Sequence, residues 1–152
     1  MGSDGTILTT TDGGGTWSPQ PSGTMADLYS VYFVDSSHGW VVGLNGTILA
    51  TTDGGASWKP QISTTPAVLH SAYFIDTRHG WVVGGNGTIM VTTDGGENWK
   101  HQASGTHANL YPVRFVDSSH GWTAGSANTI LATSDGGATW QPEFNSKYAG
   151  VR

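Results

Sequence analysis

The sequence predicts an all-β protein, and three observations lead to that prediction. Of its 152 residues, 23 are Gly and only 11% are charged, a composition that suits short strands joined by tight turns. One residue pattern returns every 41 positions along the chain. Each unit holds four short runs of β-branched and aromatic residues, and a period of about 40–50 residues with four strands per unit favours a β-propeller.

The elements of one unit follow from its residues in order. The first strand ends at a polar turn that contains Asp35 and His38, and the second runs into Asn45-Gly46. Asn-Gly is favoured in type I′ hairpins, because both central residues need a positive φ. The third strand leads into an Asp-Gly-Gly turn, and a fourth strand follows it. In the first complete unit the strands are expected at 28–34, 39–43, 47–52 and 57–62.

The chain holds three whole units and the last part of a fourth. We expect a half blade at 2–27 and full blades at 28–68, 69–109 and 110–150, or about 3.5 blades of four antiparallel strands. Apolar blade faces need a cover, so the first prediction is a homodimer that closes a ring of seven or eight blades. The alternative is a tight four-bladed ring in which the tail 148–152 supplies an extra strand. The chain starts inside a unit, which we interpret as a cut or engineered piece.

One motif, Thr-x-Asp-Gly-Gly-x-Ser/Thr/Asn-Trp, ends the third strand of every unit. Its carboxylate can accept backbone N–H groups of the turn, and its glycines permit positive φ angles. A Trp ring folded back into the blade removes on the order of 150–250 Å² from water. We therefore predict a structural role for the repeated acids and indoles, which are Asp12, Trp17, Asp53, Trp58, Asp94, Trp99, Asp135 and Trp140.

This motif resembles the Asp-box, or BNR, repeat. The full unit, with Gly-Trp-x-x-Gly-x-x-Gly-Thr-Ile ahead of the box, is similar to the Ycf48 type of propeller of photosystem II assembly factors. The resemblance covers nearly the whole chain. It implies a protein-interaction or assembly scaffold. That family is associated with a basic patch for an unassembled photosystem subunit, and the six Lys and Arg residues of this chain form no obvious equivalent.

The ionisable residues argue against an enzyme. Four of the eleven carboxylates belong to the boxes, and three more occupy the first turn of each unit, at Asp35, Asp76 and Asp117. Few carboxylates outside the repeat remain that could form the catalytic pair of a glycosidase. The Arg residues also do not match the three Arg with which sialidases bind the carboxylate of their substrate. We expect no catalytic residue and no cofactor. A glycan-binding or glycan-processing propeller is the alternative, although Tyr148 is the only Tyr or Trp residue in the expected binding-face loops.

Binding in propellers usually uses the inter-blade loops, the loops between second and third strands, and the innermost strands. Repeat-breaking residues there are the best candidates for a specific role. The candidate binding face comprises Tyr32, Asn45, His70, Tyr73, Asn86, His101, His107 and Arg114, with His101 and His107 assigned to one inter-blade loop. Three other histidines, His38, His79 and His120, repeat with the unit. We expect them to bond a backbone carbonyl or stack on a Trp, and we expect no metal.

The composition excludes several classes of partner and location for this protein. A net charge of −5 with scattered basic residues excludes an electrostatic footprint for nucleic acid. No apolar stretch is long enough for membrane insertion, and no signal-peptide pattern opens the chain. The absence of Cys excludes disulfides. The sequence therefore predicts a soluble protein and does not indicate its cellular compartment. The expected partners are a second copy of the chain and another protein.

Overall fold

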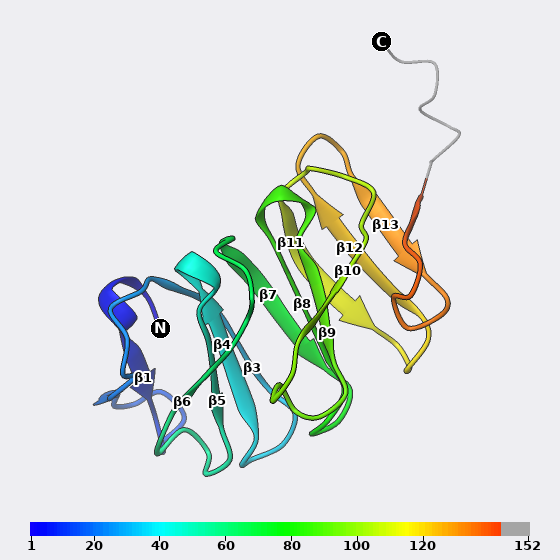
Figure 1. Cartoon of the computed structure of the whole chain (residues 1–152). Coiled ribbons are helices and arrows are strands. Elements are labelled where there is room, and N and C mark those ends of the chain that lie inside the picture. Colours follow the sequence, from blue (N-terminus) through cyan, green and yellow to red (C-terminus); the bar gives the residue numbers. More distant parts are fainter. Residues whose placement is uncertain (144–152) are drawn as a thin grey trace.

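The computed structural model describes residues 1–143, which form four antiparallel sheets (Figure 1). The first sheet has two strands, β1 (Ile7–Thr9) and β2 (Ser18–Gln20). The first complete blade contains β3 (Leu28–Phe33), β4 (Gly39–Gly43), β5 (Ile48–Thr51) and β6 (Lys59–Gln61). The second contains β7 (Leu69–Phe74), β8 (Gly80–Gly84), β9 (Ile89–Thr92) and β10 (Lys100–Gln102). The third contains β11 (Leu110–Phe115), β12 (Gly121–Gly125), β13 (Ile130–Thr133) and β14 (Gln141–Pro142).

Within each blade the strands pair in chain order, so the prediction of an all-β fold built from four-stranded antiparallel blades is confirmed. The fourth strands are shorter than expected, because the bonded turn ahead of them extends as far as the Trp of the box. The expected end of the last blade and the tail 148–152 lie outside the described residues.

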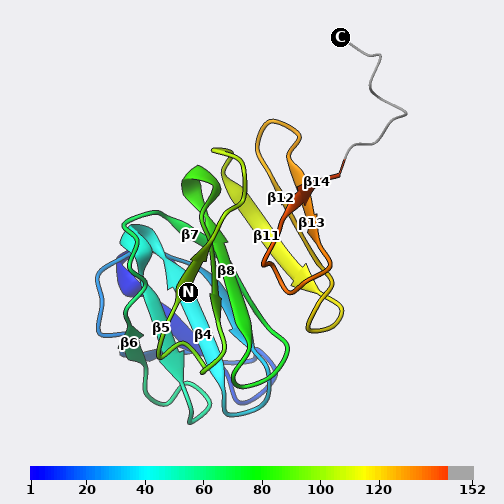
Figure 2. The same ribbon diagram turned by 45° about the vertical axis from the view of Figure 1, so that its right-hand side comes forward.

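The blades stand face to face in a row (Figures 1 and 2). The first strand β7 of the middle blade touches β3 on one side and β11 on the other. Successive first strands therefore form a shared inner edge, as the innermost strands of a propeller do. Residues 1–143 by themselves form an open row rather than a closed ring.

The hydrophobic core lies between blades, which explains why several strands are apolar on both faces. One cluster joins the first and second complete blades, and another joins the second and third. At the centre of each, an indole stacks on a Phe of the following blade. Trp40 lies 3.5 Å from Phe74 and Trp81 lies 3.6 Å from Phe115, measured between ring centroids. A Cβ on Gly80 would overlap the Phe74 ring, so the Gly of the Gly-Trp motif leaves room for this stack.

Hydrogen bonds repeat across the same interfaces. The carbonyl oxygen of Gly95 accepts Trp40 Nε1–H at 3.0 Å and a Gln61 Nε2–H at 2.9 Å. The Oε1 atom of Gln61 in turn accepts Trp99 Nε1–H at 3.4 Å. These three hydrogen bonds, which we call the glycine latch, recur between the second and third complete blades. The latch uses half-buried groups at the interface, which find their hydrogen-bond partners in the neighbouring blade.

The hairpin turns match the prediction. Asn45 and Gly46 both have positive φ, 55° and 68°, and Thr47 N–H donates to Leu44 O at 3.1 Å. The Gly46 N–H also donates to Ala67 O at 2.8 Å, and a Cβ at Gly46 would overlap the Thr65 carbonyl oxygen. Only glycine fits there. The turn and the inter-blade linker consequently share one end of the blade.

Candidate functional site

The Asp-box carboxylates are engaged within their own turns. Asp53 Oδ1 accepts Thr51 Oγ1–H at 2.7 Å and Ser57 N–H at 2.9 Å, and Thr51 Oγ1 accepts Gly55 N–H at 2.9 Å. Hydrogen bonds from Ser57 and Thr51 lower the pKa of Asp53 from 3.8 to about 2. The same type of bonding lowers the pKa to about 2 in all four boxes, at Asp12, Asp53, Asp94 and Asp135. Each carboxylate is thus ionised and occupied by donors of its own turn.

The Trp residues of the boxes differ in burial. Trp99 and Trp140 are 6% exposed, and Trp58 is half-buried. Each of these rings meets a Phe of its own blade's first strand edge to face, as Trp99 does with Phe74 at 6.0 Å. Trp17 is 57% exposed, so the expectation that its ring is buried was wrong. The physical reason is that, within residues 1–143, the half blade has no first strand to supply that Phe.

The three repeated histidines bond carboxylates. His38 Nδ1 lies 2.9 Å from Asp35 Oδ2, and Asp35 Oδ1 accepts the backbone N–H groups of Ser37 and His38 at 2.7 Å. His79 and His120 repeat this geometry. The expectation of a backbone carbonyl or a Trp as partner was wrong, because the Asp three positions earlier already turns its carboxylate toward this loop. In residues 1–143 no group of three or more His, Asp or Glu side chains is placed to hold a metal ion.

Six side chains on the first strands form two rows that cross the blades. We call this set the inner-strand face. It comprises Tyr29, His70 and Tyr111 in one row, and Tyr32, Tyr73 and Arg114 in the other. In the first row, ring centroids lie 6.0 Å apart between Tyr29 and His70 and 5.0 Å apart between His70 and Tyr111. In the second, the Tyr32 and Tyr73 centroids are 5.0 Å apart, and Arg114 Cζ lies 5.5 Å from the Tyr73 centroid.

The inner-strand face is neutral except at Arg114. Burial raises the pKa of Tyr32, with the neighbouring Tyr73 adding to the effect, so the phenol stays protonated. Burial lowers the pKa of His70, which favours its neutral form. Arg114 is exposed, and its Nη1 donates to Val113 O at 2.7 Å. The guanidinium carries five N–H donors, so donors remain for a carboxylate. The arrangement offers a row of rings across three blades and, beside it, a second row that ends in one cation.

The sequence candidates fall into three groups in space. Tyr32, His70, Tyr73 and Arg114 belong to the inner-strand face. Asn45 and Asn86 are exposed in the hairpin turns η2 (Leu44–Gly46) and η3 (Gly85–Gly87), which contact β7 and β11. His107 is exposed in the linker after β10, at the same end of the blades as η3, since Gly87 N–H donates to Ala108 O.

His101 was expected in an inter-blade loop, and that expectation was wrong. It lies on the outermost strand β10, opposite Met90 of β9, with its Nε2 3.2 Å from Thr64 Oγ1 in the preceding linker. The pairing of Lys100–Gln102 with β9 carries the strand past this residue. His101 is therefore separated from the inner-strand face.

Sequence reasoning missed Tyr29 and Tyr111. Both occupy the same position in the repeat as His70, 41 residues before and after it. That spacing was the available signal, because residues at one repeat position on neighbouring first strands come side by side. Tyr148, the one Tyr or Trp residue expected in the loops, lies outside the described residues.

Two family models match this chain. A model described as photosynthesis system II assembly factor YCF48 matches residues 22–71, 61–107 and 98–147. The chain belongs to this family. The BNR/Asp-box repeat model also matches residues 8–19, where the half blade carries its box. The resemblance to the Asp-box and Ycf48-type propellers is thereby confirmed.

Solved structures agree with the family assignment. A structure of YCF48 bound to a D1 peptide is 24% identical, with a TM-score of 0.71, and covers 91% of this chain and 42% of its own. YCF48 from Cyanidioschyzon merolae is 25% identical, with a TM-score of 0.69, and covers 80% of this chain and 41% of its own. The chain thus spans about two-fifths of these YCF48 structures.

A more distant likeness shows the fold alone. An ancestral GH74 enzyme is 20% identical, with a TM-score of 0.76, and covers 98% of this chain and 22% of its own. No curated protein sequence matches the chain. Among residues 1–143, no helix has the length and apolar character needed to cross a membrane.

Proposed function

We propose that the chain is a non-catalytic scaffold that binds a protein segment through its inner-strand face. The observation that carries the proposal is the pair of side-chain rows across three first strands, one of which ends at the exposed Arg114. Family membership supports it, as does the YCF48 structure with a bound D1 peptide. The Asp-box acids and indoles hold the blades that present this face.

The face fits an extended segment with apolar side chains and a carboxylate. Neutral phenol and imidazole rings offer flat surface at low conformational cost, since each ring is already in contact with its neighbour. Arg114 can bind a carboxylate with two parallel hydrogen bonds. In a chain with a net charge of −5, this cation is the feature of the face that favours an acidic group over a basic one.

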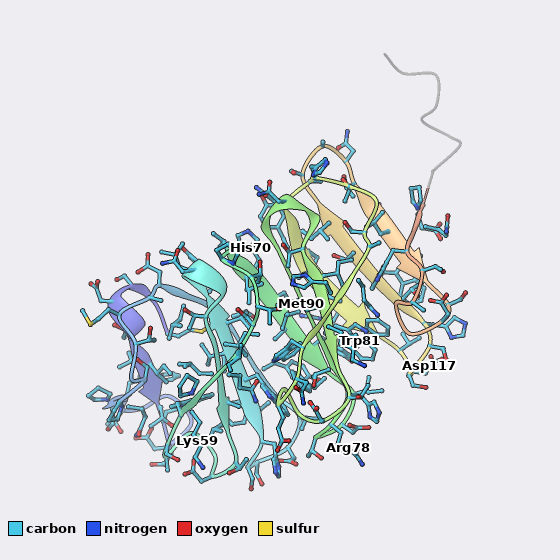
Figure 3. All side chains as sticks on the ribbon, in the orientation of Figure 1. Lys59, His70, Arg78, Trp81, Met90 and Asp117 are labelled. Atoms are coloured by element: carbon cyan, nitrogen blue, oxygen red, sulfur yellow. The ribbon has the colours of Figure 1, made fainter. Side chains whose placement is uncertain are left out.

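A binding measurement with matched Arg variants tests the proposal. The probe is a fluorescein-labelled D1 peptide, whose anisotropy is followed as the chain is added. Arg114→Gln is expected to weaken binding at least about tenfold, equivalent to about 1.4 kcal/mol. Arg78→Gln is the control, because Arg78 lies exposed in the turn at the opposite end of the blade from His70 (Figure 3). Absence of saturable binding, or equal losses in both variants, would overturn the proposal. Oligosaccharide binding without peptide binding would favour the glycan-binding alternative instead.

We also propose that copies of the chain associate through their open blade faces. Trp122 and Ile130 in the third blade are 43% and 47% exposed, whereas their equivalents Trp81 and Ile89 in the second blade are 3% and 0% exposed. Val116 on the same blade is 74% exposed. Covering this apolar surface favours pairing. Light scattering is expected to give about twice the chain mass of 15.9 kDa, and Trp122→Ser is expected to lower it. A single-chain mass at every concentration contradicts this part of the proposal.

A further inference from the structure

The half blade leaves one edge of a strand open. Within residues 1–143, β1 pairs with β2 alone, whereas the equivalent β5 lies between β4 and β6. Leu8 of β1 is opposite Pro19 of β2. Proline has no N–H, so this is a pair whose backbone groups point away from each other. The N–H and C=O of Leu8 therefore point to the open edge, where the equivalent residue Leu49 meets Val41 of β4.

Bare apolar surface lies beside this edge. Phe33 is 40% exposed and Val31 is 47% exposed, while their equivalents Phe74 and Ala72 in the next blade are each 1% exposed. A cavity of about 130 Å³ is bordered by Leu8, Val31 and Phe33, among other residues. At the next interface, side chains of the first two strands of the preceding blade cover the equivalent residues.

An unpartnered polar atom marks the same place. Trp58 borders this cavity, and its Nε1–H is buried without a hydrogen-bond partner. The equivalent indole Nε1–H of Trp99 donates to Gln61, as part of the glycine latch. At the half blade, Gln20 occupies the position of Gln61, but the indole of a preceding second strand is absent from the described residues. Of the groups that form a glycine latch, the open site therefore has the Gln and the Asp-box Trp but lacks the Trp of a second strand.

Two interfaces inside the chain show what completes the latch. In each, the second strand of one blade contributes the sequence Gly-Trp-Val-Val-Gly, at Gly39–Gly43 and Gly80–Gly84. The Trp stacks on a Phe of the next blade and donates to a Gly carbonyl of its Asp-box, as Trp81 does to Gly136 O at 3.0 Å. The corresponding receptor groups at the open site are Phe33 and the carbonyl of Gly54.

We propose that the edge of β1 and the exposed Phe33 form an acceptor site for an extended strand of the Gly-Trp-Val-Val-Gly type, supplied by another polypeptide of this repeat class. The strand adds antiparallel to β1, a recognised mode of peptide binding. By the register of β4 on β5, its Trp lies opposite Thr9 and its first Val opposite Leu8. The Trp then covers Phe33 and donates to Gly54 O. This site is independent of the inner-strand face and of Arg114.

The test uses the full chain and a labelled peptide that copies residues 37–44, Ser-His-Gly-Trp-Val-Val-Gly-Leu. Fluorescence anisotropy is expected to show saturable binding. N-methylation of the first Val removes the N–H that faces β1 and is expected to weaken binding at least about tenfold. N-methylation of the second Val alters an N–H that faces away, because neighbouring residues alternate in direction, and serves as the matched control.

Protein variants test the side-chain part of the site. Phe33→Ala is expected to weaken binding, as is replacement of the peptide Trp by Ala. Ile62→Ala removes an exposed apolar side chain just after β6, away from the cavity, and is expected to leave binding unchanged. No saturable binding, equal binding of the two N-methylated peptides, or equal losses in the Phe33 and Ile62 variants would overturn the proposal. The peptide comparison needs no change in the protein, so misfolding cannot account for its result.

Discussion

The two variants Phe74→Ala and Phe33→Ala test whether the blades are held together by the stacked rings. Both residues end the first strand of a blade and meet the Trp of their own Asp-box at 6.0 Å. They differ in what covers the other side of the ring. Trp40 stacks on Phe74 with an interplanar angle of 8°, whereas Phe33 has no such partner among residues 1–143. The comparison therefore isolates the contact with the preceding blade.

The expected difference follows from exposure. Phe74 is 1% exposed and Phe33 is 40% exposed. A Phe buries roughly 200 Å² when fully covered, so the difference in coverage is about 80 Å², or about 2 kcal/mol at about 25 cal/mol per Å². The stacked pair adds about 1 kcal/mol. Phe74→Ala is expected to cost about 3–5 kcal/mol in the free energy of unfolding, and Phe33→Ala about 3 kcal/mol less.

Urea unfolding followed by circular dichroism measures both values. The slope of the free energy against urea is expected to stay constant, so that the midpoints report stability. Equal losses for the two variants, within about 1 kcal/mol, would refute the reasoning. Such a result would mean either that the ring stack contributes little or that Phe33 is covered in solution. Unfolding at several protein concentrations separates these two explanations, since a cover supplied by another copy depends on concentration.

Three further predictions concern the latch, the hairpin turns and the Asp-boxes. Trp81→Phe removes the N–H that Gly136 O accepts and is expected to cost about 1 kcal/mol, whereas Trp122→Phe, at an exposed indole, is expected to be near neutral in the same urea assay. Gly46→Ala places a Cβ on the Thr65 carbonyl at positive φ and is expected to cost at least about 2 kcal/mol in thermal unfolding, while Gly23→Ala, at positive φ but in open space, is expected to cost about 1 kcal/mol. The Asp-box acids have pKa values lowered from 3.8 to about 2, so they bind protons more readily when unfolded; stability is fully present above 3.8 and is expected to fall between that pH and about 2, with a smaller fall in Asp53→Asn, as measured by the thermal midpoint across this window.

The repeat made most of the fold predictable. Because the same four-strand pattern returns every 41 residues and its apolar faces need a cover, each unit was expected to pack against the units beside it. The Asn45-Gly46 turn was predictable for a local reason, since few residues accept two successive positive φ angles. Both arguments needed no coordinates.

The errors arose where contacts with other strands, rather than local sequence, decide the structure. The motif around Trp17 matches the other boxes, yet its ring is exposed, because burial depends on a Phe that the first strand of its own blade would provide. His101 was misplaced because the linker begins only after β10 has paired with β9. Only part of the inner-strand face was predicted, because Tyr29 and Tyr111 belong to it through their position beside His70 and not through their residue type.

The glycine latch has a consequence for how the row comes apart. Each latch couples only nearest neighbours, so opening a middle blade breaks two interfaces and opening a terminal blade breaks one. Fraying should begin at both ends and proceed inward, with amide hydrogen exchange slowest in β7, β8 and β9. Amide hydrogen exchange would then be fastest in the terminal segments, whose exposed rings and strand edges can bind another polypeptide. Binding of such a polypeptide would supply the contacts whose absence lets these segments open.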